Sequence, residues 1–412
     1  MTPASTLTLE AVSSGPTINS KGHLTDEYCL RFEGGVSGCG SAPQGETLSC
    51  YESGAPAQAP RAEKVIDQLT ADGVIGRELS QQSFDDYLEG KLSGFGRGAV
   101  FALSCAFFEA TFQFAGRLTP PRHAVFPRFC LNILNGGRHA YTNPVLSDFH
   151  EFLLVPRRGS VEQLLDDHRA IQERVRARLS RQETTLVAGN PVHILGGRGN
   201  RDCIEFLLEI LDDAGLGERY DLMIDAAASG LWDGSAYVLD LAEQRRFSSP
   251  ELEQYWLSIL EEFPVAFLED PFTEHDLEHW RGLAAKARGC KVLGDDAHCG
   301  DARRIAHLLD SACISGMVLK PDQAGTISAT LDAVKVARAA RVPVILSHRS
   351  ISTDSLLLAH LMVYCDSELA KVGPVLSDFS SSLNMNEVLR RTPHPRLACP
   401  AADPARTRPV RI

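Results

Sequence analysis

The sequence is short of positive charge: it contains 41 Lys and Arg residues but 53 Asp and Glu residues, which gives a formal net charge of −12. Proteins that bind nucleic-acid phosphates concentrate Lys and Arg instead. The chain also lacks an uninterrupted apolar run of about 18 residues that could span a membrane. Its most apolar stretch, residues 98–116, contains Glu109 and Gln113. We therefore predict a small-molecule partner and neither a nucleic-acid nor a membrane partner.

Two further absences, of a paired-cysteine pattern and of a targeting segment, bear on the cellular compartment of the protein. The eleven cysteines include no CxxC pair and are odd in number, which favours reduced, mostly buried thiols over a disulfide framework. The N-terminal stretch MTPASTLTLEAV has neither a basic segment nor an apolar segment of the kind that opens a signal or transit peptide. Both observations predict a cytoplasmic protein.

The chain of 412 residues is longer than a single hydrophobic core usually supports. The first 55 residues are rich in turn signals and β-branched residues, which predicts a small antiparallel sheet. Helical periodicity follows, and the stretch Gly98–Ala115 is apolar on nearly all sides, so we expect it to lie between two layers. We predict an α+β domain over residues 1–118, an α/β barrel over 119–391 and a Pro- and Arg-rich tail over 392–412.

From residue 120 onward, short apolar strands alternate with helical stretches, a pattern typical of parallel βα units. Six of these strands end in ionisable or polar residues. In a βα barrel the carboxyl ends of the strands meet at one mouth, where catalytic groups lie. A single strand-terminal charge is often only solvent-exposed, but six in series predict a site. They are Asp225, Glu269, Asp295, Lys320, the run Ser347-His348-Arg349-Ser350, and Lys371.

The strand-end residues favour a particular chemistry. Asp225, Glu269 and Asp295 form a set of hard oxygen ligands that suits Mg²⁺. Lys320 and Lys371 follow on the same rim, and a lysine beside a metal and a second cation has a lowered pKa and can act as a general base. The alternative is that both lysines only form salt bridges with the carboxylates. The run from Ser347 to Ser350 offers a guanidinium, hydroxyls and an imidazole, which together suit a phosphate or phosphonate group.

These segments resemble the enolase family, in the same order along the chain from about Asn19 to Arg390. The resemblance implies an α+β capping domain followed by an enolase-type barrel. It also implies Mg²⁺ at Asp225, Glu269 and Asp295, with Lys320 as the base. Lys371 and His348 would contact the substrate, Arg349 and Ser350 would hold its phosphoryl group, and His139 and Glu151 would line the pocket. The matching segments are residues 132–140, 149–152, 224–229, 268–272, 294–296, 319–326, 347–350 and 370–373.

The departures from the family pattern concern the leaving group. Enolases carry a GDEGG loop whose glutamate assists departure of the hydroxyl, and in this chain Leu195 stands at the corresponding position. Loss of a general acid costs about 10²- to 10⁴-fold in rate. The acid role has moved to His193, His150 or a water, or else the substrate differs. Thr47 is a candidate second Mg²⁺ ligand, because it matches a loop serine of the family.

Three functions remain open on this basis. The first is a specialised lyase that makes an enolpyruvate from a glycerate phosphoester or phosphonate analogue. It would be similar to the carboxyphosphonoenolpyruvate synthases of phosphinothricin-type antibiotic biosynthesis. The second is an ordinary, divergent phosphopyruvate hydratase, and the third is a non-catalytic scaffold. The resemblance also implies a homodimer.

Overall fold

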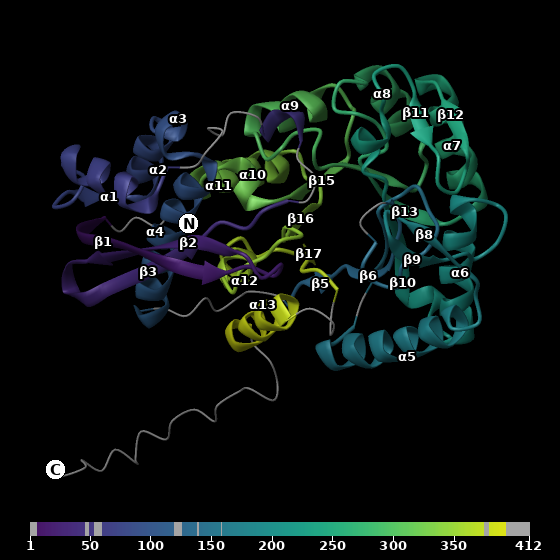
Figure 1. Cartoon of the computed structure of the whole chain (residues 1–412), viewed down its shortest axis with the longest axis horizontal. Coiled ribbons are helices and arrows are strands. Elements are labelled where there is room, and N and C mark those ends of the chain that lie inside the picture. Colours follow the sequence, from purple (N-terminus) through teal and green to yellow (C-terminus); the bar gives the residue numbers. More distant parts are fainter. Residues whose placement is uncertain are drawn as a thin grey trace, which may run out of the picture.

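The computed structural model describes residues 6–45, 49–52, 60–118, 126–137, 140–157, 159–374 and 379–392. The chain forms an N-terminal α+β domain, purple to blue in Figure 1, and a barrel ringed by helices, teal to yellow. The first domain contains a four-stranded antiparallel sheet in the order β3-β2-β1-β4. Its elements are β1 (Leu7–Ile18), β2 (Leu24–Phe32), β3 (Val36–Ser41), β4 (Glu78–Leu79), α1 (Ala62–Ala71), α2 (Gln81–Glu89), α3 (Leu92–Phe95) and α4 (Arg97–Leu118).

Helix α4 lies between the two domains, as its all-round apolar sequence predicts. Ala102 and Phe107 belong to the core of the N-terminal domain, whereas Phe101 and Phe108 belong to the core around the barrel. The helix packs so closely on β3 that only glycine fits there. A Cβ atom on Gly38 would lie 2.2 Å from a backbone oxygen of α4. One helix therefore fixes the position of the sheet relative to the barrel.

The barrel sheet has the order β5-β17-β16-β15-β14-β13-β10-β7-β6. Its two edge strands are separated by a single residue, Cys130, so one stretch of chain closes the ring into eight positions. Apolar side chains from the strands fill the interior, among them Met223, Val318 and Ile345. The strands are β5 (Arg128–Phe129), β6 (Leu131–Asn135), β7 (Glu151–Pro156), β10 (Tyr220–Asp225), β13 (Val265–Glu269), β14 (Lys291–Gly294), β15 (Gly316–Leu319), β16 (Val344–Ser347) and β17 (Leu369–Lys371).

Strand β7 departs from the predicted parallel arrangement, since it is antiparallel to both β6 and β10. A parallel connection needs a crossover, usually a helix, and the described residues between β6 and β7 contain no α-helix. The reversal matters for the site. It brings Glu151, at the start of β7, beside Asp225, at the end of β10.

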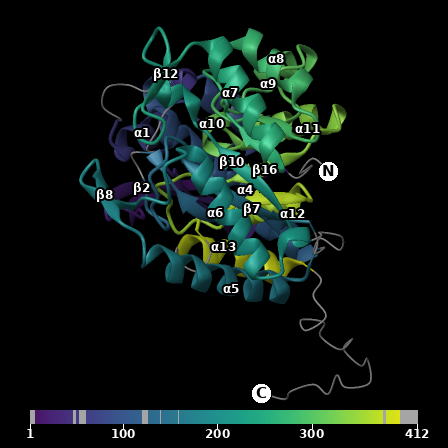
Figure 2. The ribbon, with the colours of Figure 1, turned by 90° about the vertical axis from the view of Figure 1, so that its right-hand side faces the viewer.

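Helices surround the barrel, as Figure 2 shows from the barrel side, and two short hairpins complete the fold. The helices are α5 (Val161–Leu179), α6 (Asn200–Asp213), α7 (Ser249–Glu262), α8 (Leu277–Lys286), α9 (Ala302–Asp310), α10 (Pro321–Ala324), α11 (Ile327–Ala339), α12 (Leu357–Tyr364) and α13 (Phe379–Arg391). The hairpins are β8 (Thr184–Val187) with β9 (Asn190–His193), and β11 (Tyr237–Leu239) with β12 (Arg245–Phe247).

The prediction of reduced thiols is wrong for one pair, because Cys29 and Cys39 form a disulfide. The two residues lie directly opposite each other in the ladder between β2 and β3, with Cα atoms 4.1 Å apart. A spacing of ten residues does not reveal such a pairing until the register of the hairpin is known. Of the other described cysteines, Cys50 is exposed and the rest are buried.

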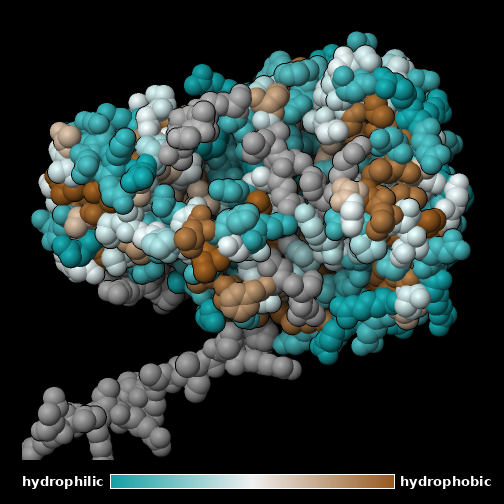
Figure 3. All heavy atoms as spheres, viewed as in Figure 1, coloured by the Kyte–Doolittle hydropathy of each residue, from teal (hydrophilic) through white to brown (hydrophobic). Residues whose placement is uncertain are grey.

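The surface in Figure 3 is mostly hydrophilic, with small hydrophobic patches. Within the described part of the chain, no helix has the length and apolar character needed to cross a bilayer. The tail predicted from residue 392 onward lies almost entirely outside the described residues.

Candidate active site

The strand ends fall where the sequence predicts them. Asp225, Glu269 and Lys371 are the last residues of their strands, and Asp295 and Lys320 follow theirs directly. The ladder places Asp225 opposite Glu269 on one side and opposite Glu151 on the other. An open cavity at this mouth is lined by Asp225, Asp295, Lys320, Lys371 and Glu151, among others. Glu269 is fully buried and is not among the residues that line the cavity.

Lys371 is surrounded by three carboxylates. Its Nζ lies 2.9 Å from Oε2 of Glu151, 3.0 Å from Oε2 of Glu269 and 3.4 Å from Oδ2 of Asp225. Burial lowers the pKa of Lys371, but the attraction of Glu151 and Glu269 outweighs it and raises that pKa well above its ordinary value. Burial, reinforced by repulsion from Asp225, raises the pKa of Glu269. The cluster is therefore held together by one ammonium group.

Asp295 lies on the other side of the site and contacts Nζ of Lys320 through Oδ2. Its second oxygen, Oδ1, is buried and has no hydrogen-bond partner among the described groups. Neighbouring Asp270 accepts hydrogen bonds from the backbone amides of Asp295 and Asp296, at 2.9 and 2.8 Å. Asp270 thus holds the turn after β14 in place, while Asp295 keeps a free oxygen for a ligand.

Of the three predicted metal ligands, Asp295 offers a buried oxygen without a partner, whereas Asp225 and Glu269 contact Lys371. Among the described residues, the three carboxylates whose oxygens lie within 4.8 Å of one another are Asp270, Asp295 and Asp296. Carboxylate oxygens are the ligands that Mg²⁺ prefers, and a buried, unpartnered carboxylate oxygen is costly unless a cation or donor satisfies it. Burial lowers the pKa of Lys320, but Asp295 and Asp296 outweigh it, so its pKa stands above the ordinary value of 10.5. The sequence analysis predicts the opposite, a lowered pKa for Lys320. Such a lowered pKa would require the positive charge of a cation bound at the carboxylates.

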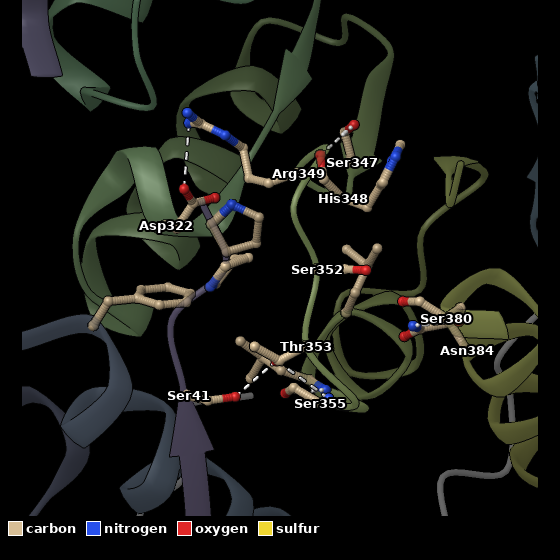
Figure 4. A pocket seen from close by; sticks show the side chains of 15 residues that line it. Ser41, Asp322, Ser347, His348, Arg349, Ser352, Thr353, Ser355, Ser380 and Asn384 are labelled. Carbon is tan, nitrogen blue, oxygen red and sulfur yellow. Dashed lines mark hydrogen bonds and ion pairs between the residues drawn. The ribbon is translucent and has the colours of Figure 1, made fainter. Parts of the chain in front are cut away.

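His348, Arg349 and Ser350 follow β16, and all three line the cavity. The backbone amide of His348 donates to the carbonyl of Lys371 at 3.0 Å, which ties the loop to β17. Asp322 pairs with Arg349 at 3.2 Å between Oδ2 and Nη1. Figure 4 shows this pair, with Ser347 and His348 on the other side of the backbone. Burial of Asp322 raises its pKa to about 6.

Two residues that the sequence did not single out also shape the site. Asn132 on β6 donates from Nδ2 to Oε1 of Glu151 at 2.6 Å, and it stands in the segment 132–140 that carries the family resemblance. Glu52 contacts Arg349 through both of its carboxylate oxygens, at 3.2 Å each. Nothing in the local sequence around Glu52 signals that contact, because its partner is 297 residues away.

Two of the predicted residues, Leu195 and His193, are not brought to the cavity at the barrel mouth. Leu195 lies beside Arg178, Asp202 and Phe206 at a separate surface cavity, and it is not among the residues lining the cavity at the barrel mouth. His193 at the end of β9 is also absent from that lining, whereas His150 belongs to it. His139 and Thr47 lie outside the described residues.

Comparison with known proteins shows which sequences the chain resembles. Residues 123–391 match the family described as "Enolase, C-terminal TIM barrel domain". The chain is 25% identical to the enolase of Ehrlichia ruminantium (strain Gardel), over 92% of this chain and 94% of that protein. It is 27% identical to the enolase of Acidothermus cellulolyticus, over 89% and 90% of the two chains. It is 25% identical to that of Sulfolobus acidocaldarius, over 86% and 89%.

Proposed function

Because the chain belongs to the enolase family, we propose that it is a carbon–oxygen lyase. It would remove the proton α to a carboxylate and eliminate a leaving group to give an enolpyruvate. The observation that carries this proposal is the placement of Lys320 at one cavity with Lys371, Asp225 and Asp295. The substrate would be a small phosphorylated or phosphonylated carboxylic acid.

Asp225, Glu269 and Asp295 would hold Mg²⁺, which when bound supplies the positive charge that stabilises the carboxylate as it gains negative charge. Lys320 would take the α-proton. Lys371 is held by Glu151 and Glu269, so its ammonium group stays in place to attract the substrate carboxylate. His348 would contact the substrate, and Arg349 and Ser350 would hold its phosphoryl group. Glu151 would orient Lys371, and His139 would complete the pocket.

For the leaving group, we propose His150 as the acid. In the ring of eight positions, β7 and β15 are four places apart in either direction. His150, directly before β7, and Lys320, directly after β15, therefore lie on opposite sides of the mouth. The electron pair of the broken C–H bond forms the C=C bond, the C–O bond breaks, and the proton from His150 converts the departing hydroxyl into water.

Matched histidine variants test the acid. His150→Gln should lower kcat by about 10²- to 10⁴-fold, whereas His193→Gln, outside the cavity lining, should leave kcat unchanged. Equal effects of the two variants would rule out His150 as the acid.

The finer proposal concerns the substrate. We favour a carboxyphosphonoenolpyruvate synthase-like enzyme of phosphonate or antibiotic biosynthesis, because the proton-abstracting groups are kept while the enolase glutamate is replaced by Leu195. An ordinary phosphopyruvate hydratase is the second candidate, supported by the matches to enolases along most of the chain. A purified-protein assay with 2-phosphoglycerate and with its carboxyphosphono analogue decides between them. Brisk turnover of 2-phosphoglycerate would contradict the specialised function.

A non-catalytic scaffold is disfavoured, because a fold maintained for its shape alone has no need of buried carboxylates around two lysines. Calorimetry that detects no Mg²⁺ binding to the wild-type protein would favour the scaffold. We also propose a cytoplasmic homodimer, on the basis of the family resemblance. Light scattering of the purified protein tests the dimer.

A further inference from the structure

The segment Ser49–Glu52, here called the strap, belongs to the N-terminal part of the chain but contacts the barrel. Oγ of Ser49 donates to the backbone carbonyl of Asp296 at 3.0 Å. The ring of Tyr51 lies under the guanidinium of Arg304, 4.1 Å from the ring centroid. The strap is therefore anchored to the turn after β14, next to the site, and to helix α9.

The last residue of the strap, Glu52, forms a buried ion pair with Arg349. The two distances, Nη1 to Oε1 and Nη2 to Oε2, are both 3.2 Å. Only 3% of the Arg349 side chain and 6% of the Glu52 side chain are exposed. Such two-point contacts fix the plane of a guanidinium as well as its position. Gln323 donates to Oε1 of Glu52 at 3.0 Å and thereby fixes the carboxylate itself.

The carboxylates approach Arg349 from outside the catalytic cavity. Glu52 and Asp322 line a second cavity together with Arg97 and Arg349. Neither acid is among the residues that line the catalytic cavity, whereas Arg349 lines both. Glu52 therefore does not occupy the place of a substrate. It supports the arginine from the far side.

We propose that Glu52 is a positioning residue that holds the guanidinium of Arg349 in the orientation that binds the phosphoryl group of the substrate. This inference rests on the proposed function, in which Arg349 binds that group. A side chain locked by buried hydrogen bonds keeps a binding group within the narrow range of positions that catalysis needs. The N-terminal domain would thus contribute a residue to the barrel's anion site, across a gap of 297 residues in the sequence.

The test compares Glu52→Gln with the wild-type protein. Glutamine has the same shape, but its amide NH₂ would face a donor of the guanidinium instead of accepting from it, so the arginine should turn. Titration calorimetry with inorganic phosphate, in the presence of Mg²⁺, should show affinity weakened about tenfold or more. With the substrate, kcat/KM should fall about 10- to 100-fold, mainly through KM. Glu52→Asp keeps the charge at a shorter reach and should lie between the two.

The matched control is Asp221→Asn, which breaks another arginine–carboxylate pair, Arg157–Asp221 at 2.7 Å, on residues that do not line the cavity. Its phosphate affinity should equal that of the wild type.

Three results would overturn the inference. They are unchanged phosphate affinity in Glu52→Gln, tighter affinity, which would mean that Glu52 competes with the anion, and absence of phosphate binding to the wild-type protein. Wild-type phosphate binding that is weakened by Glu52→Gln, without turnover of either candidate substrate, would refute the proposed function and leave this inference standing.

Discussion

Replacing Lys371 by methionine should destabilise the barrel, because the three carboxylates around its Nζ would lose their common counter-ion. The Lys371 side chain is only 6% exposed, and that of Glu269 is fully buried. At about 3 Å and an effective dielectric constant near 20, each contact is worth about 5 kcal/mol before the cost of desolvation. Removing one partner of a buried ion pair typically costs about 3–5 kcal/mol, which is the loss of unfolding free energy expected for Lys371→Met.

The assay is urea unfolding followed by tryptophan fluorescence, in EDTA and in saturating Mg²⁺. It reports on the barrel, because Trp256 and Trp280 are buried there. A ligand that binds only the folded state stabilises it by about 2.7 kcal/mol at a hundredfold excess over its Kd. Mg²⁺ should therefore recover much of the loss.

The control variant is Lys335→Met, which removes an exposed pair with Asp332 at 2.7 Å and should cost at most about 1 kcal/mol. If Lys371→Met unfolds in EDTA at the same urea concentration as Lys335→Met, the view of Lys371 as the counter-ion of the cluster is wrong.

Three further predictions follow from other parts of the molecule. Burial lowers the pKa of His360, but its hydrogen bonds with Glu109 and Glu387 raise it above 6.5 overall. Its contribution to stability should therefore be complete below pH 6.5 and be lost as the pH rises through the raised value. Thermal unfolding from pH 6 to 9 should show this loss in the wild type and not in His360→Leu. Asp225→Asn should weaken Mg²⁺ binding in calorimetry by about tenfold or more, and unchanged affinity would remove it from the ligand set. Leu195→Glu should leave kcat unaltered in a steady-state assay, because residue 195 faces a separate cavity, and a large gain in kcat would contradict that placement.

The sequence predicted the strand ends well because the signal there is local. A buried strand consists of a short apolar run, and burying a charged side chain within it is costly unless the charge has a partner. Asp225, Lys320 and Lys371 therefore mark the points where the strands reach the mouth of the barrel. Apolar residues lie on nearly all sides of α4, and this pattern likewise predicted a helix buried between two layers, because a helix that is apolar all round is not exposed to solvent.

Features that depend on pairing between distant segments could not be predicted in this way. The pairing of Cys29 with Cys39 requires the register of a hairpin, and the contact of Glu151 with Lys371 requires that β7 run against its neighbours. The position of Leu195 depends on how the β8–β9 hairpin docks, since the amide of His193 donates to the carbonyl of Pro144 at 2.9 Å. Alignment with a family motif placed the residue in order along the chain but not in space.

Both domains contribute residues to the site. The family resemblance accordingly extends over both of them. The barrel supplies the carboxylates and lysines, while the N-terminal domain pairs with the loop after β16. The backbone of Gln44 exchanges two hydrogen bonds with Ile351, both at 2.9 Å, and the amide of Ser20 donates to Ser352 at 2.8 Å. Together with the Glu52–Arg349 pair, these contacts hold the loop that carries His348, Arg349 and Ser350. A substitution that loosens α4 from β3 should therefore disturb substrate binding without touching a residue of the cavity.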